Sequence, residues 1–461
     1  MKIPGRFLTI LSIVAFLVLG TAYGQDLTER EKEMRALIER LEQRVDQLER
    51  SNEEAKPSPE LDRRVQELED KTVNIEPAKD SDFRVYWKEG LRLDSRDGAF
   101  KLKFGGRIMN DWAFFSEDSD LKAAFGNIED GTEFRRARLY ISGDIYERVM
   151  FKAQYDFAGG DADFKDMYIG FKKLPGVGNL KIGHVKEPFG LEELTSSKYI
   201  TFMERSLTSP FTPGRNTGLL LYNHALDQRL TWAAGVFQDA DGFGDGTADG
   251  NFSVTGRVTG LPWYKDKGEK LLHLGLSLSH RDIDETVRFR ERPEAHLSSV
   301  RFVDTASFAA DEEFRLGAEA AVVRGPFSAQ AEYMQSSVDA DGTSDKDFAA
   351  YYVMGSYFLT GEHRAYKPSA GAFSRVKPKR NFTFGGENRG WGAWELGLRY
   401  SSIDLDDGTI EGGEQEDITL GLNWHLNPNV RIMWNYIHAD VDHALYDGDA
   451  DILQTRFQVD F

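Results

Sequence analysis

The 461-residue chain contains no cysteine, which excludes a disulfide scaffold, thiol catalysis and cysteine-ligated zinc. Basic residues are outnumbered, with 57 Lys and Arg against 76 Asp and Glu and a net charge of −19. So acidic a chain lacks the basic surface that neutralises a nucleic-acid backbone, which argues against nucleic acid as a partner. After the N-terminus no apolar run reaches the ~18 residues of a spanning helix, which excludes a helical membrane protein.

Aromatic residues and glycine are plentiful in this otherwise polar chain, with 8 Trp, 17 Tyr, 31 Phe and 44 Gly. Aromatic side chains favour strands and membrane interfaces, and glycine favours tight turns. This combination indicates a protein built from strands and turns.

The first 24 residues have the form of a signal peptide. Lys2 and Arg6 precede an apolar stretch from Phe7 to Leu19, and small residues follow at Ala22 and Gly24. We expect cleavage after Gly24 and export of the mature chain.

Residues 25–78 carry a different pattern, which predicts a short coiled-coil stalk. Apolar residues recur every seven positions, at Leu27, Met34, Leu41 and Leu48. Each helical piece is too short to be stable alone, so self-association would have to stabilise it. A solvated amphipathic helix on the surface of the body is the alternative. Residues 79–99 are expected to form a linker.

From residue 100 to residue 461 the hydrophobic period is two. In the last segment Leu453, Phe457 and Val459 alternate with polar residues such as Arg456 and Gln458. Long alternating strands separated by turn residues are typical of a transmembrane β-barrel. Sixteen such segments are expected, at 100–116, 133–144, 147–157, 164–173, 178–186, 216–224, 228–238, 251–261, 269–281, 312–324, 326–338, 346–360, 391–404, 414–427, 429–441 and 450–461. The fold class is therefore an all-β barrel of about 16 antiparallel strands, wide enough for an aqueous lumen.

The connections between these segments are short on one side of the barrel and mostly long and Asp/Gly-rich on the other. Two connections are too long for plain turns, at 187–215 and at 361–390, and the second is rich in Arg and Lys although it lies on the short-turn side. We expect both to fold into the lumen and narrow it. A position of 361–390 on the rim is the alternative.

If the apolar set faces lipid, the alternate set lines the lumen. The inward cations are then Lys101, Lys103, Arg107, Arg136, Arg138, Lys152, Lys181, Arg257, Arg315, Arg399, Arg431 and Arg456. The inward acids on these strands are Asp111, Asp156, Glu319, Glu332, Glu395 and Asp460. Cations outnumber acids there, which predicts a preference for anions. Pairing of these residues with each other is the alternative.

Several stretches resemble the phosphate-selective porin O and P family of Gram-negative outer membranes. They are FKLKFGGRI at 100–108, EFRRARLYISGD at 133–144, NLKIGHVKEPFGLEELTSSKYITFMERSLT at 179–208, PFSAQAEY at 326–333 and GAWELGLRYSSI at 392–403. The resemblance implies a trimeric sixteen-stranded porin whose third outer loop, 187–215, folds inward. It also implies an arginine ladder, onto which Arg107, Arg135, Arg136 and Arg205 map. Where phosphate-selective members have a lysine, this chain has Glu193, and a carboxylate there would repel phosphate.

Together these arguments predict an outer-membrane porin for small solutes, with anions such as phosphate preferred. The predicted pore-lining and anion-binding residues are Arg107, Arg135, Arg136, Arg138, Lys152, Arg205, Arg257, Arg315, Arg399 and Arg431, and the constriction-loop residues are Glu192, Glu193 and Lys198. No HExxH, GxSxG or GxxxxGK[ST] motif occurs, so no catalysis, cofactor or metal is expected.

The expected partners are outer-membrane lipid, two further copies in a homotrimer, and small anionic solutes. The stalk is expected in the periplasm, where contact with peptidoglycan stays open. The alternative functions are a general non-selective porin, and a structural or adhesin barrel with a stalk and a plugged lumen. A barrel hydrolase would need a nucleophile and base in the lumen, and the alternation supplies no such pair.

Overall fold

The structure is a computed structural model, which describes Arg40, Gln43 and residues 83–461 apart from 248–251, 343 and 386–388. The chain divides into two compact units, Met1–Ser81 and Asp82–Phe461. The second unit holds every strand of the described residues. The predicted signal peptide lies outside the described residues, as does the predicted coiled-coil stalk apart from Arg40 and Gln43.

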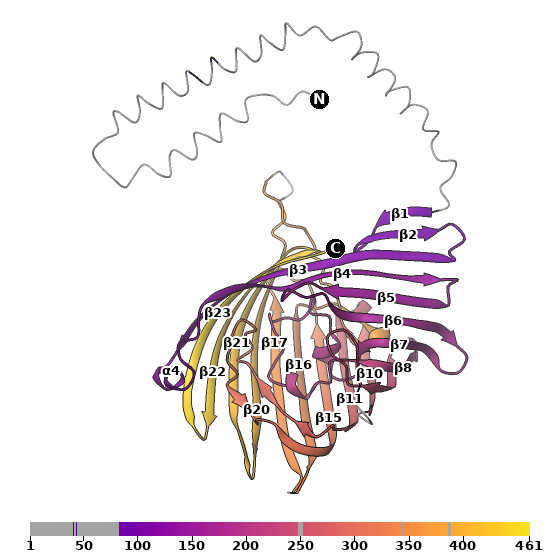
Figure 1. The fold of residues 1–461 in the computed structure, drawn as a ribbon. Helices are drawn as coiled ribbons and strands as arrows, with labels where there is room; N and C mark the ends of the chain where they lie inside the picture. The colour runs from indigo at the N-terminus through magenta and orange to yellow at the C-terminus, as the bar shows by residue number, and fades with distance from the viewer. Residues whose placement is uncertain (1–39, 41–42, 44–82, 248–251, 343, 386–388) are drawn as a thin grey trace. The chain divides into compact units, whose positions relative to one another are not determined.

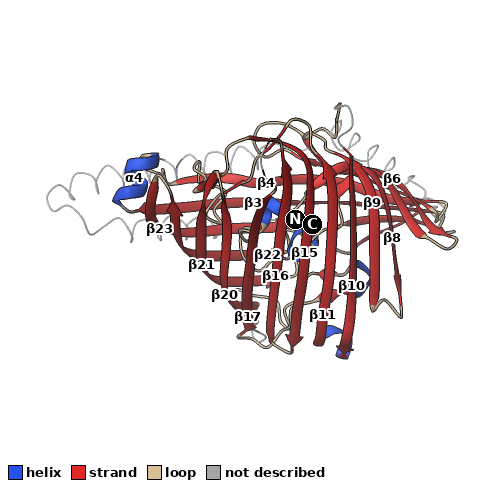
Figure 2. Ribbon diagram, turned by 90° about the horizontal axis from the view of Figure 1, so that it is seen from below, coloured by secondary structure: helices blue, strands red, loops and turns tan. Residues whose placement is uncertain are grey.

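Within the described residues, sixteen antiparallel strands form a closed barrel (Figures 1 and 2). The first eight are β3 (Phe100–Glu117), β4 (Gly131–Ile145), β5 (Val149–Asp156), β6 (Asp163–Leu174), β7 (Gly178–Lys186), β8 (Arg215–Ala225), β9 (Leu230–Gln238) and β10 (Phe252–Lys265). The other eight are β11 (Lys270–Asp282), β15 (Phe308–Arg324), β16 (Phe327–Ala340), β17 (Lys346–Phe358), β20 (Ala393–Asp407), β21 (Ile410–Asn427), β22 (Val430–His443) and β23 (Tyr446–Asp460). The predicted sixteen-stranded barrel is confirmed.

The barrel closes where its last strand pairs with its first. β23 runs antiparallel to β3, from Asp460 opposite Arg107 to Ala450 opposite Glu117. Figure 1 shows this as the yellow end of the chain beside the indigo beginning. Every barrel strand thus has two hydrogen-bonded neighbours, which is what a sheet needs in lipid, where no water can satisfy an open edge.

The alternation of side chains assigns one face of each strand to lipid and the other to the interior. On β11, Leu274, Leu276 and Leu278 are 46%, 43% and 42% exposed, whereas Ser277 and Ser279, on the other face of the strand, are buried. An exposed leucine row on a strand is unfavourable in water and favourable in hydrocarbon. Among the described residues, no helix is long and apolar enough to cross a membrane.

Connections on one side of the barrel, the turn side, are short with one exception. Tyr146 and Glu147, between β4 and β5, both have positive φ, at 46° and 59°, which matches the twist of tight hairpin turns. On the other side, the loop side, the connections carry α4 (Ser119–Phe125), α5 (Leu191–Leu194), η1 (Ser209–Phe211), β12 (Thr286–Val287), β13 (Arg290–Glu291) and β14 (Val303–Asp304). The turn side carries η2 (Asp266–Gly268), and its long exception, between β17 and β20, carries β18 (Tyr366–Lys367), η3 (Pro368–Ala370) and β19 (Ala372–Phe373).

The range 79–99, predicted as a linker, contains a hairpin that the sequence analysis missed. β1 (Phe83–Trp87) pairs with β2 (Leu91–Ser95), and β2 pairs with residues 101–104 of β3. β23 occupies the same edge of β3 from Arg107 onward. The hairpin therefore continues the sheet where the C-terminal strand ends.

Two long connections fill much of the interior. We call residues 187–214, between β7 and β8, the constriction segment, and residues 359–392, between β17 and β20, the turn-side segment. The Phe202 ring of the constriction segment lies against Gly397 and Gly421, which are directly opposite each other on β20 and β21. Phe373 of the turn-side segment donates its backbone N–H to Thr195 Oγ1 of the constriction segment, 3.3 Å away. The prediction that both segments enter the lumen is confirmed.

Candidate functional site

A cavity of about 600 Å³ lies between one half of the barrel wall and the two inward-folded segments. Strands β3 to β10 supply most of its wall, and the turn-side segment supplies Lys367, Ser369 and Ala370. Among the described residues, ten Lys and Arg side chains line it, namely Arg107, Arg136, Arg138, Lys152, Lys181, Lys186, Arg205, Arg215, Arg257 and Lys367. Asp166 is the one carboxylate on the described part of this lining. We call this cavity the basic chamber.

Several cations of the basic chamber are held by carboxylates. Arg215 Nε lies 2.8 Å from Asp166, which also pairs with Lys152. Arg138 pairs with Asp156 at 2.6 Å. These pairs fix the side chains against the wall and cancel part of their charge.

Three cations of the chamber have no ion pair within the described part of the chain: Arg107, Lys181 and Lys367. Arg107 donates to Ser197 Oγ at 2.7 Å. The Lys181 ammonium lies 4.8 Å from the ring centre of Tyr168 and 5.0 Å from that of Tyr222. Aromatic faces stabilise a cation without neutralising it. These three side chains therefore leave uncompensated positive charge on the wall.

A β-bulge explains why two consecutive arginines both reach the interior. The register between β3 and β4 shifts between Met109 and Asn110, which leaves Arg135 as the extra residue on β4. Arg135 and Arg136 both pair with Glu204 of the constriction segment, at 2.9 and 3.4 Å. The alternation predicted Arg136 inside, whereas Arg135 came only from the family resemblance.

The constriction segment is anchored by its own short helix, α5. The backbone N–H groups of Leu191 and Glu192 each donate to the Glu332 carboxylate on β16, at 2.7 Å. The Glu192 side chain pairs with Arg399 at 3.2 Å and accepts from Ser206. These contacts fix the segment against the barrel wall opposite the basic chamber.

Glu193 lies between two cations of the chamber. Its carboxylate is 2.6 Å from Lys186 Nζ and 2.8 Å from Arg205 Nε. Burial alone would raise the pKa of Glu193, but Arg205 and Lys186 lower it to about 2. The carboxylate is therefore ionised and neutralised locally, and it is not among the residues lining the chamber.

Four predicted pore-lining arginines are not part of the chamber lining, namely Arg135, described above, and Arg315, Arg399 and Arg431, which face inward. Arg315 pairs with Glu313 on its own strand at 2.5 Å, and Arg399 pairs with Glu192 and with Glu294 from the 283–307 connection. Arg431 donates to the backbone oxygen of Ile200 at 2.8 Å. Lys198, predicted in the constriction loop, pairs with Asp460 at 3.2 Å. The alternation thus gave the correct face of the strands but could not identify the loop groups that engage Arg399 and Arg431.

The chamber also contains residues absent from the predicted site. Lys181 was assigned inward by alternation but not chosen, and Lys186 and Arg215 oppose each other at the loop-side ends of β7 and β8. At a strand end the alternation is a weak guide to side-chain direction. Lys367 belongs to the turn-side segment, where the only signal was the basic composition of 361–390.

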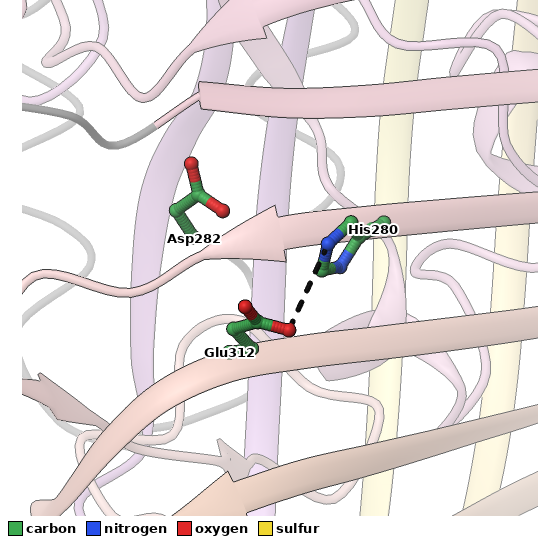
Figure 3. Close-up of side chains that lie close together, drawn as sticks. All are labelled: His280, Asp282 and Glu312. Atoms are coloured by element: carbon green, nitrogen blue, oxygen red, sulfur yellow. Dashed lines mark ion pairs between the residues drawn. The ribbon is translucent and has the colours of Figure 1, made fainter.

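Two groups of potential metal ligands occur in the described residues, both exposed and both at loop-side strand ends. One comprises His280, Asp282 and Glu312 (Figure 3). His280 Nε2 lies 3.8 Å from Glu312 Oε2. The other comprises Asp404, Asp406 and Glu414. Solvated side chains of this kind are common at strand ends, so they do not define the functional site.

A closed antiparallel barrel whose charged lumen is narrowed by its own connections is a porin-class channel of the outer membrane. The chain belongs to the phosphate-selective porin O and P family, whose model matches residues 103–461. It is 31% identical over 422 residues to Porin O of Pseudomonas aeruginosa, covering 81% of this chain and 91% of that protein. It is also 30% identical over 399 residues to an "Uncharacterized protein" of Caulobacter vibrioides, covering 82% and 77%.

Among solved structures, the anion-selective porin from Comamonas acidovorans superposes with a TM-score of 0.51 at 14% identity, covering 78% of this chain and 100% of that one. That likeness shows the fold. Family membership and fold together identify a channel of the Gram-negative outer membrane.

Proposed function

We propose that the protein is a water-filled channel for passive diffusion of small anions, with inorganic phosphate among them. The observation that carries this proposal is the wall of the basic chamber, where ten described cations face one carboxylate. A cationic wall in a confined lumen raises the local concentration of anions and lowers that of cations. Arginine adds a planar donor fork that matches phosphate oxygens.

Glu193 is compatible with phosphate passage in this arrangement. Its charge is matched by Lys186 and Arg205, so the three groups together still carry one positive charge. The repulsion that an unpaired carboxylate would exert on phosphate is therefore offset. The description of the family, phosphate-selective porin O and P, points in the same direction.

The alternative of a plugged structural barrel is less well supported, because the basic chamber leaves about 600 Å³ of the lumen open. A general non-selective porin would show no discrimination by charge. The experiment that separates these functions is single-channel recording of the purified full-length protein in a planar bilayer, first in KCl and then with added inorganic phosphate.

We expect a measurable conductance in KCl and a concentration-dependent reduction of the chloride current by phosphate. Lys181→Gln removes an uncompensated charge and should weaken the phosphate effect. Lys122→Gln, on exposed helix α4, is the matched control and should behave as the wild type does. Conductance without any phosphate effect would support the non-selective porin instead, and no conductance would support the plugged barrel.

A further inference from the structure

A second, much smaller cavity lies on the other side of the constriction segment, and it shares no described lining residue with the basic chamber. Its volume is about 20 Å³, which is room for one occupant of about the size of a water molecule. Three parts of the chain meet there. The constriction segment contributes Lys198, and the turn-side segment contributes Arg364 and Arg375. The turn-side ends of β20 and β22, which we call the barrel base, contribute Glu395 and Arg431. We call this cavity the basic pocket.

The charges around the basic pocket do not balance. Lys198 and Arg375 both pair with the carboxylate of Asp460, and Arg375 Nε also lies 3.9 Å from Glu89. Arg364 and Arg431 have no ion pair within the described residues, although each is only 3% exposed. Arg364 donates to Gln330 Oε1 at 2.7 Å, and Arg431 donates to Gln458 Oε1 at 3.0 Å.

Glu395 is the only other acid of the described lining, so four cations face three carboxylates when Glu89 is counted. Burying net charge without a counter-ion is costly, because the interior cannot solvate it as water does.

Unpartnered polar atoms are concentrated at the same place. Among the described residues, twelve buried side-chain N and O atoms have no hydrogen-bond partner. Five of these twelve atoms belong to residues that line the basic pocket. They are Thr201 Oγ1, Arg364 Nε, Arg375 Nε, Arg431 Nε and Glu395 Oε1. Four of the five can donate a hydrogen bond. A water molecule offers as many donors as acceptors, whereas an anion only accepts, so this donor excess favours an anion.

We propose that the basic pocket binds one small inorganic anion of halide size as a fixed counter-ion. Bound there, the anion joins the guanidinium group of Arg364 in the turn-side segment to that of Arg431 on β22, which also donates to Ile200 O of the constriction segment. This site differs from the permeation path in its walls, its size and its role, because its occupant stabilises the constriction rather than passing through it.

The direct test is anomalous diffraction from crystals of the full-length protein grown in bromide. The expected result is a bromide peak in the basic pocket within hydrogen-bond distance of Arg364 and Arg431. The same peak should disappear in Arg431→Gln crystals. A pocket that contains only water, with no anomalous peak in the wild type, would overturn the proposal.

A solution measurement covers the case in which a variant does not crystallise. Thermal unfolding of the detergent-solubilised protein is compared in potassium chloride and in potassium gluconate at equal ionic strength, since gluconate is too large for the pocket. The wild type and Lys181→Gln should both unfold several degrees higher in chloride, because Lys181 lines only the chamber. Arg431→Gln should lose this difference. An equal chloride effect in wild type and Arg431→Gln, or its loss in Lys181→Gln, would assign the stabilising anion elsewhere and contradict the proposal.

Discussion

At the scale of single residues, Glu193 sets how much of the charge of Lys186 and Arg205 is available to a passing anion. Its side chain is 9% exposed and contacts both cations at less than 3 Å. Because these cations lower the pKa of Glu193 to about 2, the carboxylate carries its full charge throughout the neutral and mildly acidic range. Replacing it with glutamine should therefore expose one additional positive charge to the lumen.

Glu193→Gln is expected to raise the chloride-to-potassium permeability ratio roughly fivefold, because one charge acting through about 8 Å of water favours chloride and disfavours potassium by about twofold each. Reversal potentials of the variant and the wild type, measured between pH 4 and pH 7, check this.

The pKa of Glu193 is lower in the folded protein than the usual 4.5. Its contribution to stability is therefore complete above about pH 4.5 and is lost as the pH falls towards 2.

The difference in unfolding temperature between wild type and Glu193→Gln should accordingly be constant at neutral pH and shrink below pH 4.5. A variant with unchanged or lower anion preference would show that Glu193 does not offset these two cations.

The sequence predicted which residues face the lumen, but it did not predict which groups they contact there. Alternation placed Arg107, Arg138 and Arg257 inside, where they line the basic chamber. It placed Arg399 inside equally well, but the carboxylate that engages Arg399 comes from Glu294, 105 positions earlier in the chain. A two-residue period carries no information on which distant loop returns to a given strand.

At the scale of elements, the constriction segment rests on a surface made for it by two glycines. A Cβ added at Gly421 would lie 2.9 Å from the Phe202 ring, and one added at Gly397 would lie 3.1 Å from it. Contacts this short force a neighbouring group to move. Phe202 is 1% exposed and Arg399 lies over its ring, so its displacement moves the constriction segment as well.

Gly421→Ala is expected to change the single-channel conductance and to destabilise the barrel by about 1–3 kcal/mol, the usual cost of overpacking. The matched control is Gly355→Ala on β17, where an added Cβ would meet Ser328 O at an ordinary 3.9 Å. Conductance histograms and thermal unfolding of both variants check this. Wild-type conductance in Gly421→Ala would mean that the Phe202 contact does not position the constriction.

The sixteen barrel strands could be predicted because each is long and has one apolar face. The β1–β2 hairpin could not, since its strands have only five residues each and contain the charged residues Arg84 and Arg92. Val85 and Trp87 are 60% and 62% exposed and alternate with polar residues as on the barrel strands, but five residues are too few for the alternation to mark a strand. The hairpin depends on β3 as a template, and that pairing is a tertiary contact.

At the scale of the whole molecule, charge is distributed unevenly. The chain carries −19 in total, yet the described wall of the basic chamber carries ten cations and one carboxylate. The acidic loop residues Glu192 and Glu294 pair with Arg399 on the opposite side of the lumen. One half of the interior is thus a neutralised packing region, and the other half is open and positive.

Assembly belongs to the same scale. The homotrimer, the periplasmic stalk and its contact with peptidoglycan stay predictions from sequence and family resemblance. Cross-linking of the full-length protein in native membranes is the measurement that bears on them.

The central claim is that the open half of the lumen conducts anions because its charge is uncompensated. The most direct measurement is the reversal potential of the wild-type channel in a planar bilayer under a KCl gradient. We expect a reversal potential of the sign set by chloride, reduced in Lys181→Gln and unchanged in Lys122→Gln. A wild-type potential on the potassium side would contradict it.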